Sequence, residues 1–213
     1  QLMGKGSSGT DSDLRMKFVL IGGDTETARI DGISAAGATP DAMVHTPSAD
    51  LEIVEYDHPV QAPVVPGSPS GCPTPAVITR AVRELLAFDL LAVEAGLAGS
   101  TMAPTVRIGD EVGSDIRTSD PVASASDTFE AARRLGRSLP DEELVIGETI
   151  PGGTTTALGV LTALGEQPTV SSSLPENPLS LKRGVVREAL DTSSTSNGSA
   201  AGNPIEAVRH VGD

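Results

Sequence analysis

The sequence predicts an α/β domain in which helices flank a mostly parallel sheet. Short apolar runs that end in glycine recur at residues 17–23, 89–96 and 143–147, as is typical of buried strands. Segments with helical spacing of apolar residues lie between or after these runs, as in parallel crossover units. Aromatic residues make up only 2% of the chain, so the core must consist of Val, Ile, Leu and Ala. Together these observations indicate a Rossmann-like three-layer domain.

The domain is expected to begin at residue 17. Residues 1–16 are mostly polar, with several glycines and serines, and predict a flexible leader or tag remnant outside the fold. Residues 17–213 are long enough to form one continuous core. The last helix-like segment, 204–211, is not followed by a closing strand. We therefore expect an N-terminal fragment of a longer protein, incomplete at its C-terminus.

The first strand, 17–23, is followed by three segments of different character. Residues 32–40 are small and permit close backbone approach. Apolar and acidic residues alternate at 51–56, which predicts a second strand. Repeated prolines between residues 59 and 75 exclude a helix and interrupt any central strand. This part of the chain is therefore predicted to be an extended loop.

Residues 76–88 predict a helix with one buried face. Its apolar residues at helical spacing are Ile78, Val82 and Leu85. The other side carries the charged residues Arg80, Arg83 and Glu84. The strand at 89–96 follows directly, so loop, helix and strand are ordered as in a parallel-sheet unit.

The next part of the chain, residues 100–126, is irregular and acidic, and the sequence does not decide whether it holds a short strand such as 105–108. A helix is predicted at 127–139. The apolar face of that helix consists of Phe129, Ala132, Gly136 and Leu139. After the strand at 143–147, Gly152 and Gly153 open a helix that stops at Gly165.

The C-terminal part predicts two more helices. Residues 169–178 are expected to connect a strand to a helix at 179–190. The buried residues of that helix are predicted to be Leu181, Val185, Val186 and Ala189. Residues 191–203 indicate a flexible loop, and 204–211 a last helix.

The charge of the chain disfavours several functions. It carries 15 basic and 29 acidic residues, a formal net charge of -14, which opposes binding to nucleic acid. Only Lys5, Lys17 and Lys182 are lysines. An acidic, lysine-poor surface is typical of proteins from a salt-rich cytoplasm, and an acidic mesophilic protein is the alternative.

Other classes of site are also disfavoured. No stretch approaches the roughly 20 apolar residues of a membrane-spanning helix. Cys72 is the single cysteine, so no intrachain disulfide forms, in keeping with a cytoplasmic protein. Cys72 itself is expected to be an ordinary residue. The three histidines, His45, His58 and His210, are widely spaced, and we expect neither a metal site nor a cofactor.

The strand, turn and helix around Gly152 predict an anion-binding site. Backbone amides at the start of a helix converge with the positive end of its dipole, and such places bind phosphate or carboxylate. Gly152 and Gly153 permit the turn, and the hydroxyls of Thr154, Thr155 and Thr156 add donors. The spacing is neither a Walker A motif nor a dinucleotide fingerprint. The alternative is an ordinary helix-capping turn.

Two charged residues make a ligand site more plausible than a simple cap. Glu148 directly precedes the predicted anion cradle, which favours a ligand that also carries donors, such as ribose hydroxyls or a ring N–H. The alternative for Glu148 is a capping role. Lys182 is a candidate phosphate contact in a lysine-poor chain, and the alternative is a solvated charge on a helix face.

These motifs resemble a known family. The segments 147–158 and 182–186, together with 32–40 and 71–76, look like the archaeal branch of the nicotinate-nucleotide-dimethylbenzimidazole phosphoribosyltransferases. The motifs occur in the same order, and the resemblance runs from about residue 17 to residue 213. It therefore marks the whole of the expected domain as phosphoribosyltransferase-like.

The resemblance implies transfer of a 5-phosphoribosyl group from nicotinate mononucleotide to a benzimidazole-like base. The product is an α-ribazole phosphate for the lower ligand of cobamides. By match of motif, Glu148 is the catalytic residue that faces the ribose or the acceptor base. The implied phosphate-binding residues are Gly152, Gly153, Thr154, Thr155 and Lys182. The resemblance also implies a homodimer and a general base located beyond Asp213.

Two other functions fit the same sequence features. A non-catalytic module that binds a nucleotide or phosphate would need the same glycine turn. A purely structural α/β domain would use the glycines only for packing.

Overall fold

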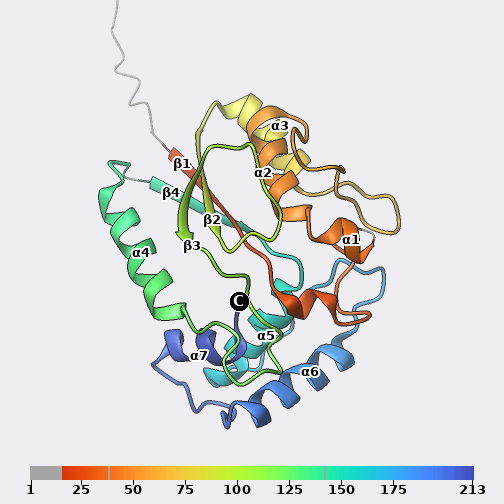
Figure 1. Ribbon diagram of the computed structural model, residues 1–213, viewed down its shortest axis with the longest axis vertical. Helices are drawn as coiled ribbons and strands as arrows, with labels where there is room; N and C mark the ends of the chain where they lie inside the picture. Colours follow the sequence, from red (N-terminus) through yellow and green to blue (C-terminus); the bar gives the residue numbers. More distant parts are fainter. Residues whose placement is uncertain (1–15, 38, 142) are drawn as a thin grey trace, which may run out of the picture.

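A computed structural model describes residues 16–37, 39–141 and 143–213. Its centre is a four-stranded sheet in which all pairings are parallel and the strand order is β3-β2-β1-β4 (Figure 1). The strands are β1 (Met16–Gly22), β2 (Asp89–Ala95), β3 (Thr105–Gly109) and β4 (Glu143–Thr149). The predicted leader lies outside the described residues except for Met16, which begins β1. The predicted α/β class with a parallel sheet is confirmed.

The register of the sheet brings the strand ends together. Leu20 of β1 pairs with Ala92 of β2 on one side and with Gly147 of β4 on the other. Gly22 at the end of β1 likewise pairs with Thr149 at the end of β4. Because parallel strands end at the same edge of a sheet, the segments that follow β1 and β4 lie side by side, where α/β proteins place their ligands.

Helices flank the sheet (Figure 1). Helix α2 (Thr46–Tyr56) packs against β1 and β4, with α3 (Ala76–Leu86) against α2, whereas α4 (Ala125–Ser138) packs against β3. A second group follows β4: α5 (Gly153–Ala163), α6 (Leu179–Thr192) and α7 (Pro204–Val211). Two short elements, η1 (Glu26–Arg29) and α1 (Pro40–Met43), follow β1. No helix in the described ranges is long and apolar enough to cross a membrane.

The buried apolar residues form two clusters. The sheet core includes Leu20, Leu51, Val54 and Ala92, and lies between β1, β2 and α2. The helical core is built mainly from α5, α6 and α7, with Leu158, Val185, Val186, Ala189 and Val211 among its members. The turn between β4 and α5 therefore joins two separately packed regions.

The predicted strand at 51–56 is wrong, because these residues belong to helix α2. The alternation was misleading because the polar residues of this helix do not face water. Glu52 is fully buried. Its carboxylate accepts hydrogen bonds from the backbone N–H groups of Val60, Gln61, Ala62 and Met102. A helix buried on all sides has no solvent face to reveal its period.

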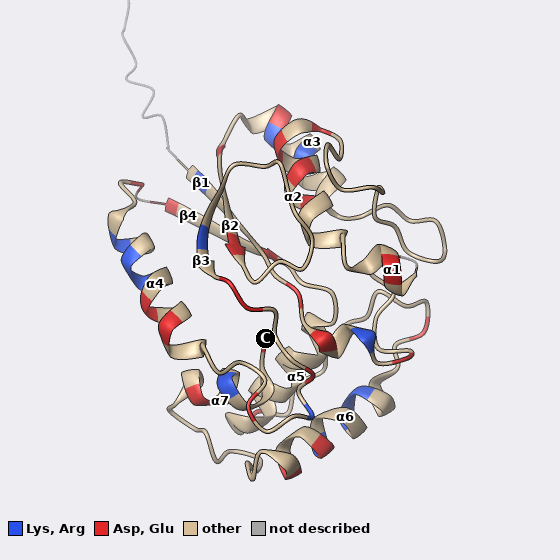
Figure 2. Cartoon of the chain, in the orientation of Figure 1, with Lys and Arg blue, Asp and Glu red and all other residues tan. Residues whose placement is uncertain are grey.

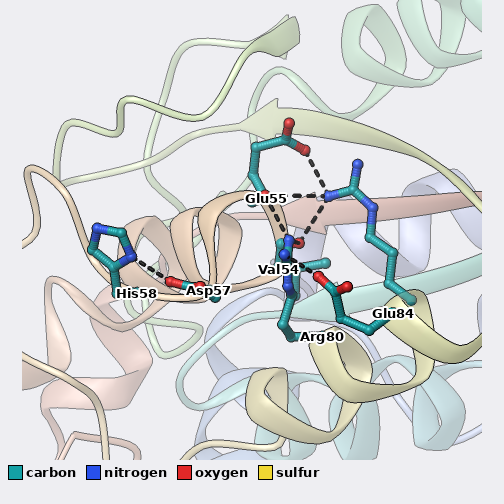
Figure 3. Close-up of polar contacts among 7 residues, drawn as sticks. Val54, Glu55, Asp57, His58, Arg80 and Glu84 are labelled. Carbon is teal, nitrogen blue, oxygen red and sulfur yellow. Dashed lines mark hydrogen bonds and ion pairs between the residues drawn. The ribbon is translucent and has the colours of Figure 1, made fainter. Parts of the chain in front are cut away.

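Helix α3 exists as predicted, but its buried face is inverted. Ile78 is 69% exposed and Leu85 is 81% exposed. The arginines turn inward instead: Arg80 and Arg83 donate to the carbonyl oxygens of Val54 and Glu55 in the last turn of α2 (Figure 3). Carbonyls at a helix C-terminus need donors, and cations are favoured there. The arginines meet this requirement, and the apolar stripe of α3 stays exposed.

Smaller differences concern the second half of the chain. Phe129, predicted on the apolar face of α4, is 47% exposed, and Leu181 of α6, predicted to be buried, is exposed. The strand expected near residues 169–178 is not formed. The predicted helices at 153–163, 179–190 and 204–211 are confirmed, and the strand that the sequence left undecided at 105–108 is formed.

Candidate functional site

A cavity of about 640 Å³ opens at the carboxyl edge of the sheet. Its walls come from β1, α2, the proline-rich loop, the turn after β4 and residues 173–175. Phe18, Leu20 and Val54 supply apolar surface, and Glu148 and Thr149 stand where β4 ends. The size and the mixture of apolar walls with a few polar groups are typical of small-molecule sites.

The cavity contains carboxyl groups but no cationic side chain among the described residues that line it. The titratable lining residues are Asp50, Cys72 and Glu148. Asp50 is buried on α2 and accepts hydrogen bonds from Thr74 Oγ1 at 2.7 Å and Thr149 Oγ1 at 2.6 Å. Burial raises the pKa of Asp50 to about 6, although the two hydroxyl bonds lower it in part. We call this region the carboxyl cavity.

Glu148 lies between the carboxyl cavity and the start of α5. A Cβ placed on Gly153 would be 3.8 Å from Glu148 Oε1, so the carboxylate and the glycine turn are neighbours, as the sequence predicted. Asp213 was not singled out from the sequence. Its Oδ2 lies 2.5 Å from Thr156 Oγ1 on the first turn of α5. Desolvation raises the pKa of the Asp213 side chain to about 6, and the charge of Glu148 adds to the rise.

The glycine turn adopts the conformation that only glycine tolerates easily. Gly152 has a φ of 84°, and a Cβ at this position would lie 3.0 Å from the backbone N and Cα of Ala28. The N–H of Gly153 donates to the carbonyl of Ile150 at 3.0 Å, and that of Thr155 donates to Gly152 at 2.8 Å. These two amides are thus engaged within the turn, and the case for an anion site depends on other donors.

Lys182 provides the strongest of these donors. Its side chain is fully buried, and Nζ donates to Thr154 Oγ1 at 2.9 Å and to the Ser171 carbonyl at 2.6 Å. Neither partner is charged, and Lys182 forms no ion pair with any residue in the described part of the chain. Burial lowers the pKa of Lys182. The alternative of a solvated surface charge is excluded, and we call Lys182, Thr154 and Ser171 the lysine corner.

Thr155, which follows Thr154 in α5, carries an unsatisfied polar group. Thr155 is fully buried, and its Oγ1 has no hydrogen-bond partner among the described residues. Buried hydroxyls normally have partners, and exceptions often mark a ligand or water position. The structure thus joins Lys182 to Thr154, and Glu148 to Gly153, around the first turn of α5.

Sequence reasoning missed Asp50 and its two threonine partners. Asp50 falls just before the segment predicted as a strand, so its place beside the end of β4 was not visible. The available signal was an acidic residue between the apolar residues Ala49 and Leu51. The described residues hold no group of three His, Cys, Asp or Glu side chains arranged to bind a metal.

No family model matches the chain. It is 59% identical to the UPF0284 protein of Halobacterium salinarum over 206 residues. The matched region covers 97% of this chain and 61% of that protein. It is 44% identical over 199 residues to the UPF0284 protein of Thermococcus gammatolerans, covering 92% of this chain and 60% of that protein. The chain thus spans about three-fifths of the length of these archaeal relatives.

Two solved structures share the fold. A nicotinate-nucleotide-dimethylbenzimidazole phosphoribosyltransferase from Thermus thermophilus matches with a TM-score of 0.62 and 17% identity, over 93% of this chain and 53% of that chain. A structure of CobT from the same organism matches with a TM-score of 0.63 and 16% identity, over 93% and 54%. The resemblance drawn from the motifs is thus confirmed at the level of the fold, which this chain shares with these structures, and its sequence relatives are archaeal.

Proposed function

We propose that this chain is the nucleotide-binding part of a transferase that moves a 5-phosphoribosyl group from nicotinate mononucleotide to a benzimidazole-like base. The product would be an α-ribazole phosphate, the lower-ligand precursor of cobamides. The observation that carries the proposal is Lys182, a buried ammonium with two neutral partners beside the first turn of α5. The shared fold supports the same assignment.

A buried ammonium without a counter-ion is costly, because neutral acceptors only partly replace water. A phosphate at the lysine corner would offset this cost. It would also meet the positive end of the α5 dipole. The hydroxyl of Thr155 would supply a further donor, since it has no protein partner in the described structure. Gly152 and Gly153 would allow the phosphate close to the backbone.

Glu148 would act on the other end of the nucleotide. A ribose that extends from the lysine corner toward the carboxyl cavity would pass Glu148. The Glu148 carboxylate would accept hydrogen bonds from the ribose hydroxyls or face the acceptor base. As one ring nitrogen of the acceptor attacks the anomeric carbon, the bond to nicotinate breaks and its electron pair leaves with nicotinate. The proton on the acceptor's other ring nitrogen passes to a carboxylate. Positive charge then develops on the ribose, and a nearby carboxylate stabilises it. The transferase and its homodimer, implied by the resemblance, belong to the same proposal.

The first test is calorimetric titration of nicotinate mononucleotide, in high salt, into the wild type, Lys182→Met and Arg183→Met. Arg183 is the matched control, because it is the next residue of α6 and is exposed. We expect Lys182→Met to weaken binding at least about ten-fold, as for loss of a charge-assisted phosphate contact, and Arg183→Met to bind normally.

Equal binding by the wild type and Lys182→Met would contradict the proposal, as would absence of binding to the wild type. A second measurement follows nicotinate release in the presence of dimethylbenzimidazole. Release supports the transferase, whereas binding without release favours the non-catalytic nucleotide-binding module.

A further inference from the structure

The carboxyl cavity contains a carboxyl group, Asp50, that the proposed function does not use. Asp50 reaches the cavity from α2 and is buried. Thr74 of the proline-rich loop donates to Oδ1, and Thr149 at the end of β4 donates to Oδ2. One carboxylate thus ties together three segments that are distant in sequence, and its orientation is fixed from both sides.

The hydrogen bonds of Asp50 leave it able to accept more. Each oxygen of a carboxylate has two lone pairs, and each is engaged here by one hydroxyl. A third donor can therefore bind from the cavity side without displacing either threonine. Burial raises the pKa of Asp50 to about 6, so the group is an acceptor at neutral pH.

The remaining walls define the chemistry of such a donor. Phe18, Leu20, Val54 and Ala76 form apolar surface, and no lining residue of the described structure is cationic. An anion would face Asp50 and Glu148 without a counter-charge. A flat, neutral ring with an N–H at its edge would bury its faces against the apolar residues and donate to a carboxylate.

We infer that Asp50 recognises a ring N–H of a bicyclic heteroaromatic molecule bound in the carboxyl cavity. This inference rests on the proposed function in one respect: it assigns the acceptor base, rather than the ribose or phosphate, to Asp50. Asp50 is then the residue that distinguishes an acceptor with a free N–H from one without.

The test uses indole, which has the bicyclic shape and one N–H but does not titrate near neutral pH. The chain contains no tryptophan, so indole fluorescence reports binding directly. The comparison probe is 1-methylindole, which lacks the N–H. We expect the wild type at pH 8 to bind indole at least about ten-fold more tightly than 1-methylindole, as for one hydrogen bond to a charged acceptor.

The matched variants are Asp50→Asn and Asp24→Asn. Asp24 is also a shielded carboxyl with a pKa raised to about 6 by burial, but it is not among the described residues that line the cavity. We expect the preference for indole to fall to about three-fold or less in Asp50→Asn and to persist in Asp24→Asn. If Asp50→Asn does not fold, Thr74→Val should show an intermediate preference, because it removes one group that orients the carboxylate.

Three results would overturn the inference: no indole binding to the wild type, equal binding of the two probes, or an unchanged preference in Asp50→Asn. None of these measurements involves nicotinate mononucleotide. A failure of the phosphate site therefore appears only in the titration of the nucleotide, and a failure of Asp50 only in the indole comparison.

Discussion

The lysine corner and the carboxyl cavity are neighbouring regions with opposite charge. Lys182 is a buried cation whose partners are a hydroxyl and a carbonyl. Asp50 is a buried acid whose partners are two hydroxyls. Each lacks a counter-charge among its hydrogen-bond partners. Figure 2 shows acidic and basic residues distributed over the helices and loops of the chain. The contrast favours a ligand with an anionic end and a neutral ring end.

The two regions also depend on different parts of the fold. Lys182 emerges from α6 in the helical core, and Asp50 from α2 in the sheet core. Two segments connect them: the turn from Glu148 to Gly153, and residues 171–175, which supply Ser171 to the lysine corner and line the carboxyl cavity at 173–175. A substitution in the turn should therefore affect both regions, whereas a substitution at Lys182 or Asp50 should affect one.

The largest effect is expected for Gly152→Ala. The substitution places a side chain at a φ of 84° and 3.0 Å from the backbone of Ala28. We expect unfolding free energy to fall by roughly 2–5 kcal/mol from strain and overpacking. Denaturant titration measures the change. The control is Gly184→Ala in α6, where a Cβ meets nothing within 4 Å, and which should be stabilised by up to about 1 kcal/mol. Equal effects of the two changes would contradict this view of the turn.

Helix α2 holds two buried carboxyl groups, Glu52 and Asp50, whose pKa values shift in opposite directions. Burial of Glu52 is outweighed by backbone N–H donors at Met102, Val60, Ala62 and Gln61, so its pKa is lowered. A lowered pKa means stability that is present above the unfolded value and lost as the pH falls. We expect Glu52→Gln to cost about 3 kcal/mol at pH 7, and less in acid. Glu55→Gln, which loses a partly exposed pairing with Arg83, should cost less than about 1 kcal/mol.

Asp50→Asn is expected to have the opposite sign. The pKa of Asp50 is raised from 3.8 to about 6, so the folded protein binds this proton more tightly than the unfolded chain does. Wild-type stability therefore falls as the pH rises from about 4 to about 6, and stays lower above it. At pH 8 the variant should be more stable by up to about 3 kcal/mol, with no advantage at pH 3.5. A variant that is less stable than the wild type at pH 8 would show that the carboxylate is structural.

The sequence predicted one of these regions better than the other. The strands and the turn at Gly152 were predictable because apolar runs ending in glycine depend on local chemistry. Lys182 was noticeable because lysine is rare in this chain. Asp50 was missed because α2 is buried on all sides and shows no helical period. The inverted face of α3 was not predictable either, since Arg80 and Arg83 meet the end of α2, a tertiary contact that leaves no local pattern.

The smallest change in stability, and the sharpest test of the contrast, is expected for Lys182→Met. Burial lowers the pKa of Lys182, so the charged form costs stability at neutral pH and the cost decreases as the pH rises toward 10.5. Removing the charge also removes two hydrogen bonds, and we expect a net change within about 1 kcal/mol.

Nicotinate mononucleotide at a hundred times its Kd should stabilise the wild type by about 2.7 kcal/mol. Thermal unfolding should show this gain in full in the wild type and in Asp50→Asn, and a gain smaller by about 1.4 kcal/mol or more in Lys182→Met, because the lysine corner holds the anionic end. A gain in Lys182→Met equal to that of the wild type would place the phosphate elsewhere, whereas its loss in Asp50→Asn would mean that the two regions do not act separately.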